Sequence, residues 1–236
     1  MRRIFLTLFF CLITYSAQAQ FASDTFTDTN GTLLTLHTST SGHSWSQTAG
    51  AIITIQSNKA QTNSTLATTI QTAIISATPP TADYSVEVTC RLSVITNSNN
   101  YCGGLVRKQS GAETYYSYSI RGGTASNRKT VLEEVTAGSR ADLFVDTDAD
   151  LTADTDYVLK IEIRGSEIKV YKDTVLKTTT TDASISTTGS AGIVMRMSSA
   201  TQTADADTFT ATDLSVAGGE VIIISDLIQQ MNRRNV

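Results

Sequence analysis

Short stretches in which apolar and polar residues alternate recur along the chain, and they constrain the fold more than any other feature of the sequence. Side chains of a β-strand point alternately to its two faces, so such a stretch has one buried face and one solvated face. The stretches are rich in Thr, Val, Ile and Tyr, and Gly, Asn, Ser and Asp separate them. Helical periodicity is nearly absent. The sequence therefore predicts an all-β fold, a two-sheet antiparallel β-sandwich whose clearest strands are residues 84–95, 101–108, 114–121, 130–135, 157–164, 167–172, 191–197 and 207–216.

Two connections between these strands have the composition of turns. Gly165-Ser166 separates residues 157–164 from 167–172, and a two-residue link with glycine is a favoured hairpin turn. The segment 97–100 has the sequence Asn-Ser-Asn-Asn, which predicts a second hairpin between the strands that carry Cys90 and Cys102.

The first residues have the three parts of a secretory signal peptide. Arg2 and Arg3 are the basic start, residues 4–13 are the apolar part, and Ala17-Gln18-Ala19 is a small-residue cleavage site. The apolar part is too short to span a bilayer, which takes about 20 residues, and no second such run follows. We expect residues 1–19 to be removed and the mature chain to be secreted, or periplasmic or otherwise extracellular, without a membrane span.

We expect residues 20–217 to form one sandwich domain and residues 218–236 to form a tail. In this tail an apolar run, 221–224, precedes a predicted short helix, 227–233. The tail can fold onto the sandwich as a strand and helix, or it can serve as a docking or assembly tag through which copies of the chain associate.

Cys90 and Cys102 remain after cleavage, and an exported protein can oxidise them to a disulfide. The alternative is a pair of buried thiols, because cysteine packs well as a small apolar residue. A zinc site is not expected, since the spacing is not Cys-x-x-Cys and only His37 and His43 could add ligands.

Charge limits the classes of partner. The net charge of −4 and the pI near 5.2 argue against nucleic acid and anionic membranes, which need a concentrated basic surface. Aspartates cluster in residues 142–156, which either could bind calcium or form a solvated edge protected by charge.

The order of several motifs resembles that of a known superfamily. Residues 24–33 begin with Asp-Thr-Phe-Thr-Asp, residues 43–45 are His-Ser-Trp, and the predicted hairpin at 157–176 is followed by Ala-Gly-Ile at 191–193 and Asp-Thr-Phe at 207–209. Over most of residues 22–216 the chain resembles the concanavalin A-like lectin/glucanase superfamily, especially laminin G-like members in secreted bacterial and phage proteins. The resemblance implies a jelly roll whose concave face or rim loops bind saccharides. It also implies a structural Ca²⁺ where the first and last strands meet, with Asp24 and Asp207 at the matching positions.

Catalytic patterns are absent from the sequence. The Glu-x-Asp-x-x-Glu run of the glucanase branch does not occur, and the adjacent Glu133 and Glu134 must point to opposite faces of a strand. There is no Gly-x-Ser-x-Gly motif, and we expect His37 and His43 to lie in surface loops. We therefore do not expect an enzyme.

A saccharide site needs aromatic faces and charged or amide groups that bind hydroxyls. Tyr116 and Tyr118 share one face of a strand, Arg107 lies on the strand expected beside it, and Arg121 lies at the strand end. These four are the predicted carbohydrate-binding residues, followed by Glu87 and Arg91. In the alternative interpretation Tyr116 and Tyr118 belong to the core, which is also where the single tryptophan, Trp45, is expected.

The sequence thus predicts an exported, non-catalytic module that binds a glycan or cell-surface polysaccharide or mediates surface attachment. The alternatives are a structural or assembly protein of a virion or extracellular appendage and, third, a glycoside hydrolase.

Overall fold

The computed structural model describes residues 18–48, 52–62, 70–111, 113–124, 126–148, 150–199 and 201–215. Residues 19–215 form one compact unit. The predicted signal peptide and the predicted C-terminal tail lie almost entirely outside the described residues. Within the described residues no helix is long and apolar enough to cross a membrane.

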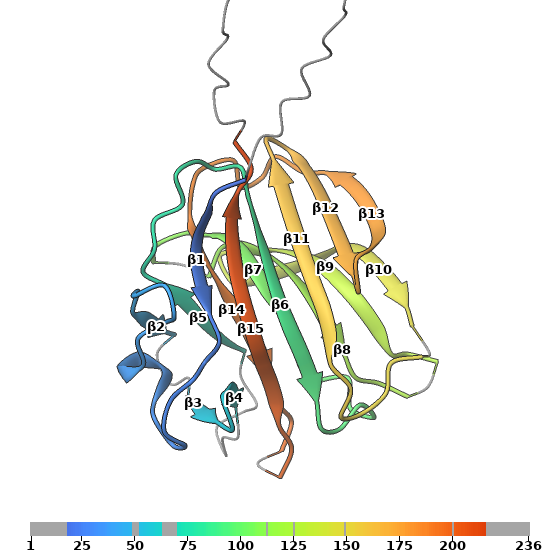
Figure 1. Ribbon diagram of the computed structural model, residues 1–236. Coiled ribbons are helices and arrows are strands. Elements are labelled where there is room, and N and C mark those ends of the chain that lie inside the picture. Colours follow the sequence, from blue (N-terminus) through green and yellow to red (C-terminus); the bar gives the residue numbers. More distant parts are fainter. Residues whose placement is uncertain are drawn as a thin grey trace, which may run out of the picture. The chain divides into compact units, whose positions relative to one another are not determined.

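The described residues form two antiparallel sheets that pack face to face as a sandwich (Figure 1), as predicted. The eight-stranded sheet has the order β13-β12-β11-β6-β15-β4-β3, and β1 also pairs with β15. Its strands are β1 (Gln20–Asp24), β3 (Ile53–Gln56), β4 (Lys59–Thr62), β6 (Tyr84–Leu92), β11 (Tyr157–Arg164), β12 (Glu167–Lys172), β13 (Val175–Thr181) and β15 (Ala204–Asp213).

The seven-stranded sheet of the described residues has the order β10-β9-β8-β7-β14-β5-β2. Its strands are β2 (Trp45–Gln47), β5 (Gln71–Ile75), β7 (Tyr101–Lys108), β8 (Tyr115–Arg121), β9 (Lys129–Thr136), β10 (Ser139–Thr147) and β14 (Ser190–Arg196). A turn of 3₁₀ helix, η1 (Leu34–Leu36), precedes β2.

The predicted hairpin at Gly165-Ser166 is confirmed. Strands β11 and β12 pair antiparallel up to Arg164 and Glu167, so the two residues between them form the loop. Gly165 has a positive φ of 56°, a conformation that glycine adopts without the steric cost of a Cβ atom.

The predicted hairpin through residues 97–100 is wrong. Strand β6 belongs to the eight-stranded sheet and β7 to the seven-stranded sheet, so the connection crosses from one layer to the other. The alternation of apolar and polar residues cannot distinguish a hairpin within one sheet from a connection between two sheets, because each strand buries one face in both arrangements. Cys90 of β6 and Cys102 of β7 therefore face each other across the interior, where both are buried free cysteines. A disulfide between them stays a prediction.

Apolar side chains from the facing sides of the two sheets fill the interior. Trp45 is 3% exposed, as expected of a core residue, and its ring lies 5.2 Å from that of Phe209 and 5.7 Å from that of Phe26. Burying three large aromatic rings together anchors the N-terminal segment to the last strand, β15.

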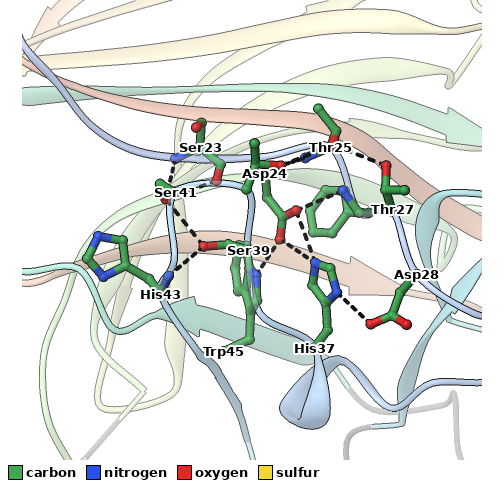
Figure 2. Close-up of polar contacts among 12 residues, drawn as sticks. Ser23, Asp24, Thr25, Thr27, Asp28, His37, Ser39, Ser41, His43 and Trp45 are labelled. Atoms are coloured by element: carbon green, nitrogen blue, oxygen red, sulfur yellow. Dashed lines mark hydrogen bonds and ion pairs between the residues drawn. The ribbon is translucent and has the colours of Figure 1, made fainter.

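A buried polar cluster lies beside these rings (Figure 2). The carboxylate of Asp24 accepts hydrogen bonds from Trp45 Nε1 at 2.7 Å and from the backbone N–H of Phe26 at 2.8 Å. His37 bridges Asp24 and Asp28, with its ring nitrogens 3.1 Å and 3.0 Å from their carboxylate oxygens. Burial alone would lower the pKa of His37, but the two carboxylates outweigh it and the pKa is raised. The expectation that His37 lies on a loop surface is wrong, because it is 3% exposed.

Acidic residues of the 142–156 stretch connect the edges of the two sheets. Asp146 of the edge strand β10 forms a 2.6 Å ion pair with Lys177 of β13, and Asp148 contacts Lys172 of β12. These ion pairs agree with the interpretation of a charged edge. Among the described residues no group of three or more His, Cys, Asp or Glu side chains could hold a metal ion.

Candidate functional site

The seven-stranded sheet carries a second cluster of buried apolar residues, separate from the core, on its outer face. Tyr101 and Leu105 belong to this cluster, whereas Cys102 and Val106, which alternate with them along β7, face the interior. The cluster comprises Tyr101, Leu105, Tyr115, Val135 and Val194, with Ile70 and Ile74 partly buried against it. An outer sheet face that buries its own aromatic and aliphatic side chains differs from an ordinary solvated face.

Basic residues cross this outer face in a row. Arg196 of β14 is paired with Tyr101 of β7, which is paired with Arg121 of β8, which is paired with Lys129 of β9. Residues paired directly across strands have Cβ atoms about 5 Å apart on the same face, and like charges so placed are destabilising. We call Arg196, Tyr101, Arg121 and Lys129 the basic row.

One buried carboxylate serves two of the arginines on this face. Glu133 of β9 is 2% exposed, and its Oε2 atom lies 2.8 Å from Arg140 Nη2 and also contacts Arg121 Nη2. The side chains of Arg121 and Arg140 are 14% and 22% exposed. Two guanidinium groups thus share one carboxylate in a poorly solvated place, where charge is costly unless it is paired.

Tyr101 lies between the same two arginines. Arg140 Nη1 donates a 2.7 Å hydrogen bond to the Tyr101 hydroxyl, and the guanidinium carbons of Arg121 and Arg140 lie 5.1 Å and 5.3 Å from the ring centre. Both distances are within the range of cation–π attraction. Burial raises the pKa of Tyr101. Because the ring is 3% exposed, the guanidinium groups and not the ring are what this site offers to a ligand.

Several polar atoms of this face are buried without a hydrogen-bond partner. They are the Nε atoms of Arg121, Arg140 and Arg196 and the hydroxyls of Ser117 and Ser119. Ser117 and Ser119 lie on this face because they are paired with Leu105 and Gly103 on one side and with Glu133 and Val131 on the other. Buried polar groups in proteins are usually satisfied, so these atoms call for partners that the described residues do not supply.

A pocket of about 310 Å³ adjoins the same sheet at its β2–β5 side. Its lining residues include Ser46 and Thr72, which the strand pairing places on the outer face with Ile74. The outer face of the seven-stranded sheet therefore combines a charged cluster with an adjoining polar hollow.

The structure does not bring the six predicted carbohydrate-binding residues together. Arg107 is 1% exposed and donates hydrogen bonds to the carbonyls of Ala82, Ile185 and Gly165 at 2.7 to 3.0 Å. Burial lowers its pKa. Arg107 is thus a buried structural residue that ties three segments together, and its predicted place on the binding surface is wrong.

Tyr116 and Tyr118 face the interior, as the alternative interpretation held. The Tyr116 hydroxyl donates a 2.5 Å hydrogen bond to Asp182 and accepts one from the backbone N–H of Ile185. Burial raises the pKa of Tyr118 to about 12. Neither ring can stack on a sugar.

Glu87 and Arg91 lie on β6, on the outer face of the other sheet. Arg91 forms a two-atom ion pair with Asp156 at 2.7 and 3.1 Å. Glu87 lines a shallow pocket of about 200 Å³ with Lys160, Glu162 and Tyr171 among its neighbours. Of the six predicted residues, Arg121 alone belongs to the candidate site described above.

The residues predicted for calcium do not fit that ion. All the contacts of Asp24 described above come from N–H groups, and Asp207 is paired at 3.1 Å with Lys59 of β4. A hard cation needs several free oxygen ligands, and these carboxylates already bind protein nitrogen atoms.

Sequence reasoning missed Tyr101, Glu133, Arg140 and Arg196. The available signal was the alternation itself. Along their strands, Arg121 is an odd number of residues from the core residue Tyr116, and Glu133 is next to the core residue Leu132. Because side chains alternate, Arg121 and Glu133 must both point away from the core. The structure confirms that Glu133 and Glu134 point to opposite faces, because their partners Ser117 and Tyr116 do.

The fold is similar to that of several solved structures. The carbohydrate binding module CBM66 from Bacillus subtilis aligns with a TM-score of 0.53 and 16% identity, covering 72% of this chain and 92% of that chain. The VIP36 exoplasmic/lumenal domain in its Ca²⁺/Man2-bound form aligns with a TM-score of 0.54 and 10% identity, covering 81% and 90%. The binding domain of botulinum neurotoxin serotype D aligns with a TM-score of 0.54 and 12% identity, and 48% of that chain is covered.

At these identities the likeness shows the fold alone, a jelly-roll sandwich. No model of a protein family matches the chain, and no curated protein matches it.

Proposed function

We propose that this protein is a non-catalytic carbohydrate-binding module and that it binds saccharide on the outer face of the seven-stranded sheet. The observation that carries the proposal is the group of buried, unpartnered donors around Arg121, Arg140 and Glu133 on a face that lies outside the core. Sugars present many hydroxyls, and guanidinium and carboxylate groups held in fixed positions are suited to bind them.

The similar solved structures support this proposal by analogy. One is a carbohydrate binding module and another is a lumenal domain in a Ca²⁺/Man2-bound form. Fold alone does not determine function, so the site residues must decide it. The non-catalytic character is likewise a proposal and rests on the opposite orientation of Glu133 and Glu134.

A glycan array tests the proposal with matched variants of the two sheets. The protein from Gln20 onward is compared with Arg121→Ala, in which the candidate site is changed, and with Arg91→Ala, which removes an arginine from the opposite outer face. We expect the unchanged protein and Arg91→Ala to retain the same glycans and Arg121→Ala to lose them. Circular dichroism checks that each variant is folded.

Two outcomes would contradict the proposal. An array on which the folded protein retains no glycan would exclude carbohydrate binding. Loss of retention in Arg91→Ala with full retention in Arg121→Ala would instead place the site on the eight-stranded sheet.

A further inference from the structure

We infer that the saccharide bound at this face carries carboxylate groups, so that the ligand is a polysaccharide containing uronic acid. The inference rests on the proposed function and specifies its ligand class. It follows from the charge of the face, the geometry of its arginines and the burial of the aromatic rings.

The face has an excess of positive charge in an acidic protein. Two carboxylates oppose four cations on this face. The carboxylates are Glu133 and Asp142, which lies 3.9 Å from Lys129 Nζ, and the cations are Arg121, Arg140, Arg196 and Lys129. Two positive charges therefore remain uncompensated here, whereas the whole chain has a net charge of −4. A neutral sugar would leave this excess in place, and an anionic one would neutralise it.

The unpartnered atoms specify the kind of anion. Arg121, Arg140 and Arg196 each have a buried Nε–H without a hydrogen-bond partner. The Nε–H and one Nη–H of a guanidinium group form a planar fork that matches the two oxygens of a carboxylate. Arg121 and Arg196 lie on either side of Tyr101 in the basic row, so successive acidic residues of a polymer could be bound along it.

The aromatic residues favour the same conclusion. Neutral saccharides are commonly bound by stacking on exposed rings, but Tyr101 and Tyr115 are 3% and 1% exposed. With no exposed ring in this cluster, charge-assisted hydrogen bonds are the strongest interactions that the site can make.

The test compares polymers that differ in charge and little else. Binding of polygalacturonate, alginate and hyaluronan is measured by isothermal titration calorimetry, each beside its carboxyl-reduced form, with dextran sulfate as a second anion. We expect at least one uronate polymer to bind, its carboxyl-reduced form to bind at least about tenfold more weakly, and added salt to weaken the binding.

Matched variants locate the effect. Arg196→Gln and Arg121→Lys should each weaken uronate binding by about tenfold, the second because lysine keeps the charge but loses the planar fork. Arg91→Gln removes the same charge from the opposite sheet and should leave binding unchanged. Arg196→Gln keeps the test decisive if Arg121→Lys does not fold, because Arg196 has no contact with Glu133 among those described.

The outcomes separate this inference from the proposed function. Binding of neutral polymers that is lost in Arg121→Lys would overturn the inference and leave the proposed function standing. Equal binding of dextran sulfate and uronates would also overturn it, because it would show attraction to any anion. A lack of binding to every neutral and acidic polymer would overturn both.

Discussion

The two outer faces of the sandwich use the same charged residue types in different ways. On the eight-stranded sheet the acidic partners are partly exposed, as in Lys160–Glu162 at 2.5 Å and Lys169–Glu167 at 2.7 Å. Asp156, which is 42% exposed, contacts both Arg91 at 2.7 Å and Lys59 at 3.7 Å. On the seven-stranded sheet Arg121 and Arg140 share Glu133, which is almost fully buried. Ion pairs that are exposed to solvent contribute little to stability. Charges that are buried are costly unless they are paired, so the shared carboxylate of Glu133 matters more to its two arginines.

The two outer faces should differ most in how much stability the protein loses when one carboxylate is removed from each face. Glu133→Gln leaves two poorly solvated guanidinium groups without a counter-charge, and we expect it to lower the free energy of unfolding by about 3 kcal/mol or more. Glu162→Gln breaks a partly exposed pair and should cost less than about 1 kcal/mol. Urea denaturation of both variants measures this. Equal losses would mean that the two faces are not energetically distinct.

The next effect concerns the link between the two sheets. Cys90 and Cys102 lie on opposite sheets and interact through their sulfur atoms, and burial raises the pKa of the Cys90 thiol. The raised pKa and the burial disfavour the reactive thiolate, so the exchange should be slow. We predict that prolonged exposure to oxidised glutathione converts the two thiols to a disulfide. The oxidant accepts the two electrons and is reduced to two thiols. The product should be about 2 to 3 kcal/mol more stable than the reduced protein.

Mass spectrometry after unfolding in an alkylating reagent checks this prediction. The oxidised protein should carry no alkyl group on either cysteine, and the double variant Cys90→Ser, Cys102→Ser should show no change in stability with oxidant. Complete alkylation of both cysteines after prolonged oxidation would contradict it.

The smallest effect comes from removing one hydroxyl on each face. Tyr101→Phe removes the acceptor of a 2.7 Å hydrogen bond from Arg140, and we expect a loss of about 1.5 kcal/mol because the donor is charged and poorly solvated. Tyr171→Phe removes a 3.3 Å hydrogen bond to Glu162 on the other face and should cost less than about 0.5 kcal/mol. Thermal unfolding of both variants compares them, and a larger loss for Tyr171→Phe would reverse the assignment of the buried face.

Much of the fold followed from local patterns. All eight strands expected from alternation exist, and the ends of residues 101–108, 157–164 and 167–172 are those of β7, β11 and β12. The strands that escaped prediction are short or carry many threonines and charges, as β13 and the edge strand β10 do, because edge strands need not alternate cleanly.

The candidate site could not be predicted to the same degree because it depends on which strands are neighbours. Tyr101, Arg121 and Arg196 are far apart in sequence and meet only because β14, β7 and β8 are adjacent. The expected β6–β7 hairpin placed Glu87 and Arg91 beside β7, whereas the connection crosses between layers. A single mistaken pairing thus moved two residues to the wrong sheet.

The ion pairs at the edge of the sandwich have a consequence for how the protein behaves at high concentration. An unpaired edge strand can recruit the strand of another molecule and start a growing aggregate. The charges of Asp146 and Lys177, with Asp148 and Lys172, are satisfied across the two edge regions, so an incoming strand would have to displace a charged partner on both sheets. Crowded copies of this protein should therefore resist polymerising through this edge.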